Sequence, residues 1–183
     1  LIFFRSVPVS EFLFGLEWSP QTAIRADQVG SSGAFGAVPL FAGTLLISFI
    51  AMSVAVPIGL MSAIYLAEYA IDTRFTRLIR LAIVNLAGIP SIVYGLFGLG
   101  IFVLFMDMGT SIIAGSLTLG IMTLPVVIST SEEAILAVPQ EFRLVSLSLG
   151  ATHWQTIRNQ VMPQALPGII TGIILGLGRA AGE

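Results

Sequence analysis

The stretch PLFAGTLLISFIAMSVAVPIGLMSAIYL, residues 39–66, decides the fold class because it contains no charged side chain. It lies in an uncharged run from 28 to 67, and similar runs occupy 81–106, 108–131 and 159–178. Each run can hold about 20 apolar residues, enough to cross a bilayer core as a helix. A soluble protein would need a charged outer layer, yet only 10% of the 183 residues are charged. The sequence therefore predicts an all-α, polytopic membrane helical bundle.

Four full spans are expected within a single transmembrane domain, residues 1–183. They occupy 39–66, 81–106, 112–130 and 168–183. Arginines set the orientation, since cytoplasmic loops carry an excess of Lys and Arg. Three arginines lie in 67–80 and two in 131–167, which predicts that both loops are cytoplasmic and that 5–37 is a mostly polar or irregular external loop. The chain starts in an apolar segment and ends within a helical run, so we expect an internal fragment of a longer membrane protein.

Prolines interrupt two of the expected spans. Pro57 should kink or break the first span. In the second, NLAGIPSIVYG (85–95) suggests a broken helix that lines a cavity, with Asn85, Ser91 and Tyr94 as possible path-lining residues. The alternative is a packing kink between small residues, which the residues alone favour.

The insert between the last two spans predicts a helix–turn–helix. Its first part, SEEAILAVP (131–139), continues the preceding helix and stops near the proline, with Glu132 and Glu133 at a solvated helix end. A helix follows with Phe142, Val145 and Leu149 on one face.

A second short helix follows a glycine hinge at Gly150. Thr152 and Gln155 fit a capping box at its start. Its amphipathic stripe consists of Trp154, Ile157 and Val161, and Pro163 is expected to end it.

The composition excludes several kinds of chemistry. The chain has no Lys and no Cys, and its one histidine is His153. A phosphate-binding loop lysine and the usual zinc or iron–sulfur ligand sets are therefore excluded. His153 is expected to make a surface contact. Arg74, Arg77 and Arg80 are expected to anchor the cytoplasmic interface, with lipid head groups as a secondary option. We expect no enzyme, no bound metal and no nucleic-acid partner.

Several stretches resemble a known family. LGATHWQTIRNQVMPQALPG (149–168) resembles the cytoplasmic EAA loop of ABC-type importer permeases, with Gly150 and Pro163 at the family's spacing. Leu144, Val145 and Ser146 stand where the family has Glu-Ala-Ala. NLAGIPSIVYGLFGL, LPVVISTSEEAILAVP and GIILGLGRAAGE are similar to the phosphate (Pst) permeases. The part after Ile71 is more PstA-like and the front more PstC-like.

The resemblance implies a type I ABC importer permease that moves inorganic phosphate across the inner membrane. Its implied partners are an ATPase subunit dimer that binds and hydrolyses ATP, a second homologous permease and a periplasmic phosphate-binding protein. This chain itself would bind no cofactor. The implied ATPase-coupling residues are Gly150, Ala151, Thr152, Trp154, Ile157 and Pro163.

Arg179 and Glu183 are the candidate transport-path residues. An arginine at bilayer depth is costly, and guanidinium suits phosphate oxygens. Gly172 and Gly176 share its helix face and would permit close helix packing. An i,i+4 pair that snorkels to the surface is equally compatible with the residues, while the resemblance favours the transport path. Two other functions stay open: a permease for another oxyanion or small solute, and an ion-driven secondary transporter. The chain shows neither the internal repeat nor the intramembrane acids of the latter.

Overall fold

A computed structural model describes residues 8–19 and 34–183. The chain forms two compact units, Leu1–Leu46 and Ile47–Glu183, which are described separately. Part of the expected external loop, including Arg25 and the GSSG cluster, lies outside the described residues.

The first unit contains short regular elements where an irregular loop was expected. Helix α2 (Val9–Phe14) precedes β1 (Trp18–Ser19), which pairs antiparallel with β2 (Ala34–Phe35). The Trp18 and Phe35 rings pack edge to face with their centroids 6.2 Å apart. The described part of 5–37 is therefore not irregular throughout.

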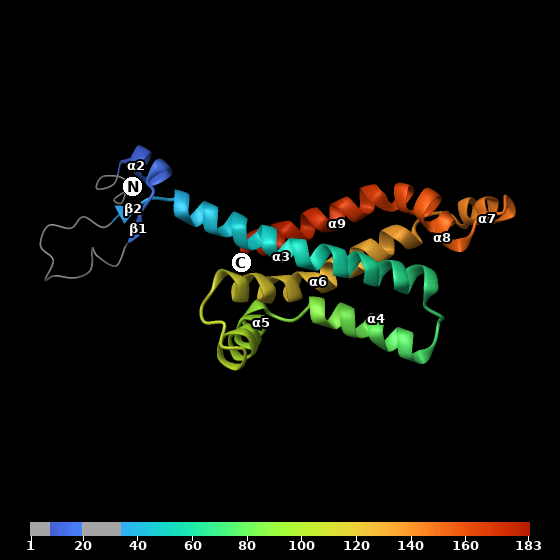
Figure 1. Ribbon diagram of the computed structural model, residues 1–183, viewed down its shortest axis with the longest axis horizontal. Coiled ribbons are helices and arrows are strands. Elements are labelled where there is room, and N and C mark those ends of the chain that lie inside the picture. Colours follow the sequence, from blue (N-terminus) through green and yellow to red (C-terminus); the bar gives the residue numbers. More distant parts are fainter. Residues whose placement is uncertain (1–7, 20–33) are drawn as a thin grey trace, which may run out of the picture. The chain divides into compact units, whose positions relative to one another are not determined.

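The second unit is a helical bundle (Figure 1). Helix α3 enters it from the first unit, and π-helical turns (η) extend several of its helices. In order the elements are α3 (Val38–Ile64), η2 (Tyr65–Tyr69), α4 (Arg74–Ala87), α5 (Ser91–Gly98), η3 (Leu99–Phe105), α6 (Ile112–Leu136), α7 (Gln140–Ser148), α8 (His153–Thr156), η4 (Ile157–Val161) and α9 (Met162–Gly182).

Among the described residues, three continuous helices are long and apolar enough to cross a membrane: Val38–Tyr69, Ile112–Leu136 and His153–Gly182. They include the expected first, third and fourth spans. The prediction that Pro163 ends a helix is wrong, because the π-helical turn η4 precedes it and Pro163 enters the first turn of α9. The π-helical turn, in which the Met162 N–H donates to the Ile157 carbonyl, carries the helix up to the proline. Pro57 likewise does not break α3.

The expected second span consists of two helices bent by 97° at Gly88–Pro90. This confirms the predicted break in NLAGIPSIVYG. The first of the two, α4, begins at Arg74 rather than after Arg80, because Thr73 caps it by accepting from the Thr76 N–H at 3.2 Å. Neither helix alone has the length of about 20 residues that a bilayer core requires.

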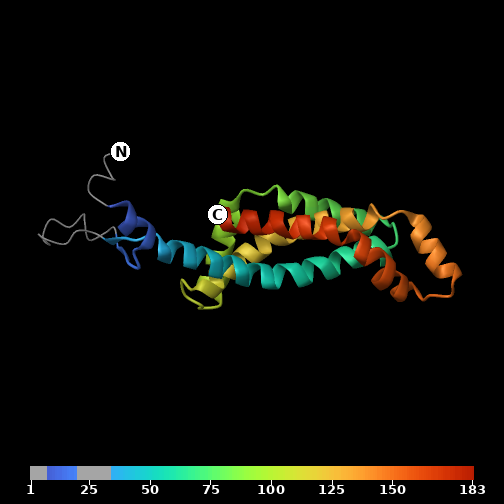
Figure 2. The same ribbon diagram turned by 90° about the horizontal axis from the view of Figure 1, so that it is seen from above.

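Helix α6 occupies the centre of the second unit and packs against α4, α5 and α9. After Ile47, α3 runs beside α6 and α9 (Figure 1 and Figure 2). Glycines make the close approach possible: a Cβ at Gly172 would lie 2.1 Å from Thr130 Oγ1, and one at Gly168 would lie 2.7 Å from Ala134 Cβ. Gly172 therefore permits the close helix packing expected of it.

Candidate functional site

Arg179 lies at the break between α4 and α5. Its Nη1 donates to the Ala87 carbonyl at 3.2 Å, and the Tyr94 hydroxyl donates to the Leu86 carbonyl at 2.8 Å. Both carbonyls belong to the last turn of α4, where backbone acceptors lack the usual N–H donor four residues on, and the Leu86 carbonyl also accepts from the Ile89 N–H at 3.2 Å. A cation at a helix C-terminus is also favoured by the helix dipole. The structure thus brings three predicted features together: the broken helix, Tyr94 and Arg179.

A pocket of about 240 Å³ opens beside this break. Ser91 and Tyr94 line it from α5, and Glu183 lines it from the end of α9. Asn85 is exposed and is not among the described residues that line it. Because the Tyr94 hydroxyl already donates to Leu86, it can offer a ligand only an acceptor in this conformation.

Arg179 is half-buried, whereas Glu183 is exposed. The ion pairs found among the described residues do not include one between them. The guanidinium is oriented by the Ala87 carbonyl instead. One hydrogen bond engages one of its five N–H donors, so the group keeps donors for an anion.

Residues 140–161, which we name the 140–161 hairpin, form a locally specified unit of α7, α8 and η4. Gly150 has φ +86°, as expected of a glycine that ends a helix. The N–H of Gly150 donates to Leu147 O at 3.0 Å and that of Ala151 to Ser146 O at 3.2 Å, the paired bonds of a Schellman motif.

The predicted capping box is confirmed. Thr152 Oγ1 accepts from the Gln155 N–H at 3.3 Å, and Gln155 Oε1 accepts from the Thr152 N–H at 2.9 Å. The Ser146 and Thr156 hydroxyls lie 3.0 Å apart and join the two arms of the 140–161 hairpin.

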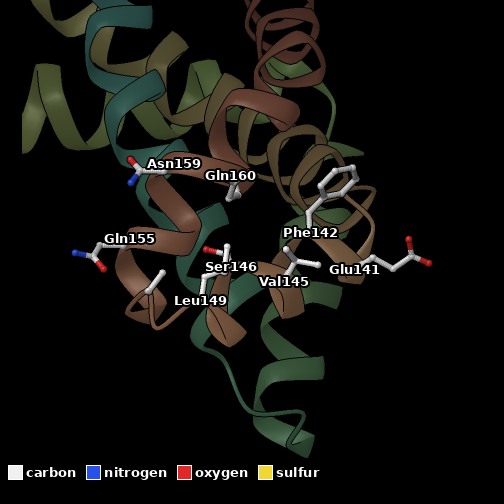
Figure 3. Close-up of a pocket in the computed structure, with 9 residues that line it drawn as sticks. Glu141, Phe142, Val145, Ser146, Leu149, Gln155, Asn159 and Gln160 are labelled. Carbon is white, nitrogen blue, oxygen red and sulfur yellow. The ribbon is translucent and has the colours of Figure 1, made fainter.

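A groove of about 490 Å³ separates the arms of the 140–161 hairpin (Figure 3). Phe142, Val145 and Leu149 line it, as the predicted helix face requires, and are 47%, 59% and 83% exposed. Polar side chains surround them: Glu141, Ser146, Gln155, Asn159 and Gln160. The groove presents an apolar floor with a hydrogen-bonding rim.

The predicted stripe of Trp154, Ile157 and Val161 is divided by the fold. Ile157 and Val161 are 1% and 0% exposed, whereas Trp154 is 56% exposed. Ile157 and Val161 belong to η4, next to α9, whereas Trp154 lies on the short helix α8 at the far end of the arm. Ile157 therefore stabilises the bundle instead of offering a surface to a partner.

An ion-pair cluster at the base of the 140–161 hairpin was not predicted from the sequence. Arg143 Nη2 and Nε donate to Glu68 Oε1 at 2.7 and 3.1 Å. Arg143 also donates to the carbonyls of Ile135 and Val138, at the end of α6. His153 stacks on Tyr69 with ring centroids 5.1 Å apart. The signal was a single charged residue, Glu68, directly after an apolar span.

The predicted solvated helix end is wrong for Glu132. Its carboxylate is 12% exposed and lies 2.9 Å from Arg80 Nε. Arg80 also donates to the Leu66 carbonyl at 2.8 Å, so it links α4 to the bundle while its side chain stays 39% exposed. Arg77 pairs with Asp72 at the surface.

Comparison with known proteins gives the family. Residues 55–183 match the family described as binding-protein-dependent transport system inner membrane component. The probable ABC transporter permease protein YqgI of Bacillus subtilis (strain 168) is 42% identical over 137 residues, covering 75% of this chain and 47% of that protein. Phosphate transport system permease protein PstA 1 of Mycobacterium tuberculosis (strain ATCC 25618 / H37Rv) is 41% identical over 141 residues, covering 77% of this chain and 46% of that protein.

A relative of the PstC type also matches. Phosphate transport system permease protein PstC of Pasteurella multocida (strain Pm70) is 32% identical over 197 aligned positions, covering 94% of this chain and 58% of that protein. The chain spans about half the length of the curated relatives it matches. The family match covers residues 55–183, and the structure has several helices long and apolar enough to cross a membrane. The chain therefore belongs to the family of inner membrane components of binding-protein-dependent transport systems.

Proposed function

We propose that this chain forms the core of a permease subunit in an ATP-driven ABC importer for inorganic phosphate. ATP would be bound and hydrolysed by a dimer of separate ATPase subunits. A second homologous permease and a periplasmic phosphate-binding protein would complete the assembly. The names of the PstA and PstC relatives support phosphate as the cargo, while YqgI carries no named substrate.

One observation carries the proposal: a single helix, His153–Gly182, joins the 140–161 hairpin to Arg179. Its 30 residues extend about 45 Å at 1.5 Å per residue. Because the helix is unbroken, displacement of the 140–161 hairpin would be passed along it to the guanidinium at the α4–α5 break. Movement at the ATPase and access to the anion path would be linked in this way.

The groove of the 140–161 hairpin is the proposed contact with the ATPase. A partner would cover the exposed apolar floor of Phe142, Val145 and Leu149. Hydrogen bonds to the polar rim would fix the position of the ATPase along the groove. The hairpin also contacts Glu68 and Tyr69 in η2, directly after α3, which agrees with a role in coupling.

A matched pair of variants tests the contact. Val145 and Leu144 lie on the same helix and are 59% and 64% exposed, but only Val145 is among the groove-lining residues. In the full-length protein, Val145→Asp should reduce co-purification of the ATPase subunit, whereas Leu144→Asp should leave it close to wild type. Equal losses from both variants would remove the groove from the proposed contact.

Competition separates the candidate cargoes. ATP-driven uptake of labelled phosphate should be inhibited by unlabelled phosphate far more than by sulfate or molybdate. Arg179→Gln should lower uptake of the preferred anion, since a neutral amide lacks the charge-assisted hydrogen bond. Preferential inhibition by sulfate or molybdate would favour another oxyanion, and indifference to all three would favour a small organic solute.

A further inference from the structure

Glu68 occupies an unusual position for a charged residue at the end of an apolar helix. Its side chain is only 7% exposed, and it lies in the π-helical turn η2 that ends the first long helix. The carboxylate accepts two hydrogen bonds from Arg143 on α7. Its other oxygen lies 4.0 Å from His153 Nε2 on α8. One side chain thus contacts both arms of the 140–161 hairpin.

Arg143 completes the connection on the other side. Its guanidinium donates to Glu68 and to the Ile135 carbonyl at 2.9 Å, which belongs to the last turn of α6. Arg143 is 17% exposed, so these bonds are largely shielded from water. Charge-assisted forked hydrogen bonds fix both distance and direction.

Apolar contacts alone would not hold α3 in register with the 140–161 hairpin. Ala63 at the end of α3 packs in one cluster with Val138, Val161 and Ala165. Such contacts scale with the apolar area buried and are non-directional. The Glu68–Arg143 pair adds charge-assisted hydrogen bonds between the two segments, beside the stacking of His153 on Tyr69.

We propose that Glu68 is the positioning residue through which the 140–161 hairpin moves α3 during transport. The inference rests on the proposed function, because it concerns how movement of the same hairpin reaches the spans. Helix α9 is attached to the 140–161 hairpin by the continuous chain, and α6 by a short turn. Helix α3 has no such covalent connection, and the hydrogen bonds of Glu68 to Arg143 supplement its apolar packing and the Tyr69–His153 stacking. Without Glu68, the ATPase still docks and hydrolyses ATP, but α3 does not follow.

The test measures the ratio of phosphate transported to ATP hydrolysed. Full-length wild-type and Glu68→Gln proteins are assembled with the ATPase subunits in proteoliposomes, and both rates are recorded together with the amount of bound ATPase. Gln retains the shape of Glu but not the charge. Asp72→Asn is the matched control, because its ion pair with Arg77 is exposed at the surface.

We expect Glu68→Gln to lower the transport-to-hydrolysis ratio about tenfold, within the range of about 5- to 150-fold typical of coupled sites. Bound ATPase should stay at the wild-type level, since a side chain this buried offers no surface to a partner. Asp72→Asn should leave the ratio unchanged. A wild-type ratio in Glu68→Gln would overturn the inference, as would a parallel loss of bound ATPase.

A second variant covers the case in which Glu68→Gln fails to accumulate in membranes. Arg143→Lys keeps the positive charge but loses the forked geometry, and the same fall in the ratio is expected. An unchanged ratio in Arg143→Lys would then overturn the inference. The proposed function fails in a different way, namely when the wild-type assembly itself shows no ATP-dependent phosphate uptake.

Discussion

Replacing Gly172 with alanine should push α6 and α9 apart. The added Cβ would lie 2.1 Å from Thr130 Oγ1 and 2.9 Å from Thr130 Cβ, well inside van der Waals contact. Thr130 cannot rotate away freely, because its Oγ1 donates to the Val126 carbonyl at 2.8 Å. Overpacking of this kind costs about 1–3 kcal/mol. The greater helix propensity of alanine offsets about 1 kcal/mol of that cost. We expect a net loss of about 0–2 kcal/mol.

Gly178→Ala is the matched control on the same helix. Among the described residues, none lies within 4 Å of a Cβ built at Gly178. This variant should be as stable as wild type, or more stable by up to about 1 kcal/mol. Thermal unfolding of the full-length protein in detergent distinguishes the two variants, with Gly172→Ala at the lower midpoint.

A double variant tests whether the clash with Thr130 causes the loss of stability in Gly172→Ala. Thr130→Ala combined with Gly172→Ala removes the oxygen that lies 2.1 Å away but keeps the Cβ at 2.9 Å, so it should recover part of the lost midpoint. The reasoning is refuted if Gly172→Ala unfolds at the same temperature as Gly178→Ala.

Three further predictions concern local structure. Gly150→Ala places a Cβ at φ +86° and should destabilise the 140–161 hairpin by about 1–2 kcal/mol. Limited proteolysis should then cleave the hairpin faster than in wild type, and an unchanged cleavage rate would contradict this prediction. Thr152→Ala removes the capping box and should lower the free energy of unfolding by about 1 kcal/mol, whereas Thr152→Ser should stay close to wild type. Equal thermal unfolding midpoints for the two variants would argue against the cap. Tyr94→Phe removes one of the two donors to the Leu86 carbonyl at the α4–α5 break, where the Ile89 N–H remains, and should cost about 0.5–1.5 kcal/mol; a midpoint equal to wild type would show that this bond contributes little.

Features that depend on a few neighbouring residues could be predicted from the sequence. Uncharged runs indicated the long helices, and Gly88 with Pro90 indicated the break between α4 and α5. Gly150 and the Thr152–Gln155 pair were predictable because each acts within one turn of chain.

Features that depend on the spacing of whole helices could not be predicted. The π-helical turn η4 was not predicted, and the burial of Ile157 depends on how this arm packs in the bundle. Glu68 and Arg143 are far apart in the chain and meet only after α3 and α6 have packed. Likewise, the partner of Arg179 is a backbone carbonyl, Ala87, so no residue type in the sequence points to it.

ATP-driven phosphate uptake is the most direct test of the account. The full-length protein, assembled in proteoliposomes with its second permease, ATPase subunits and binding protein, should accumulate labelled phosphate when ATP is supplied to the ATPase side. Imposed proton or sodium gradients without ATP should give no accumulation. Gradient-driven uptake that needs neither ATP nor the ATPase subunits would contradict the account and identify an ion-driven transporter instead.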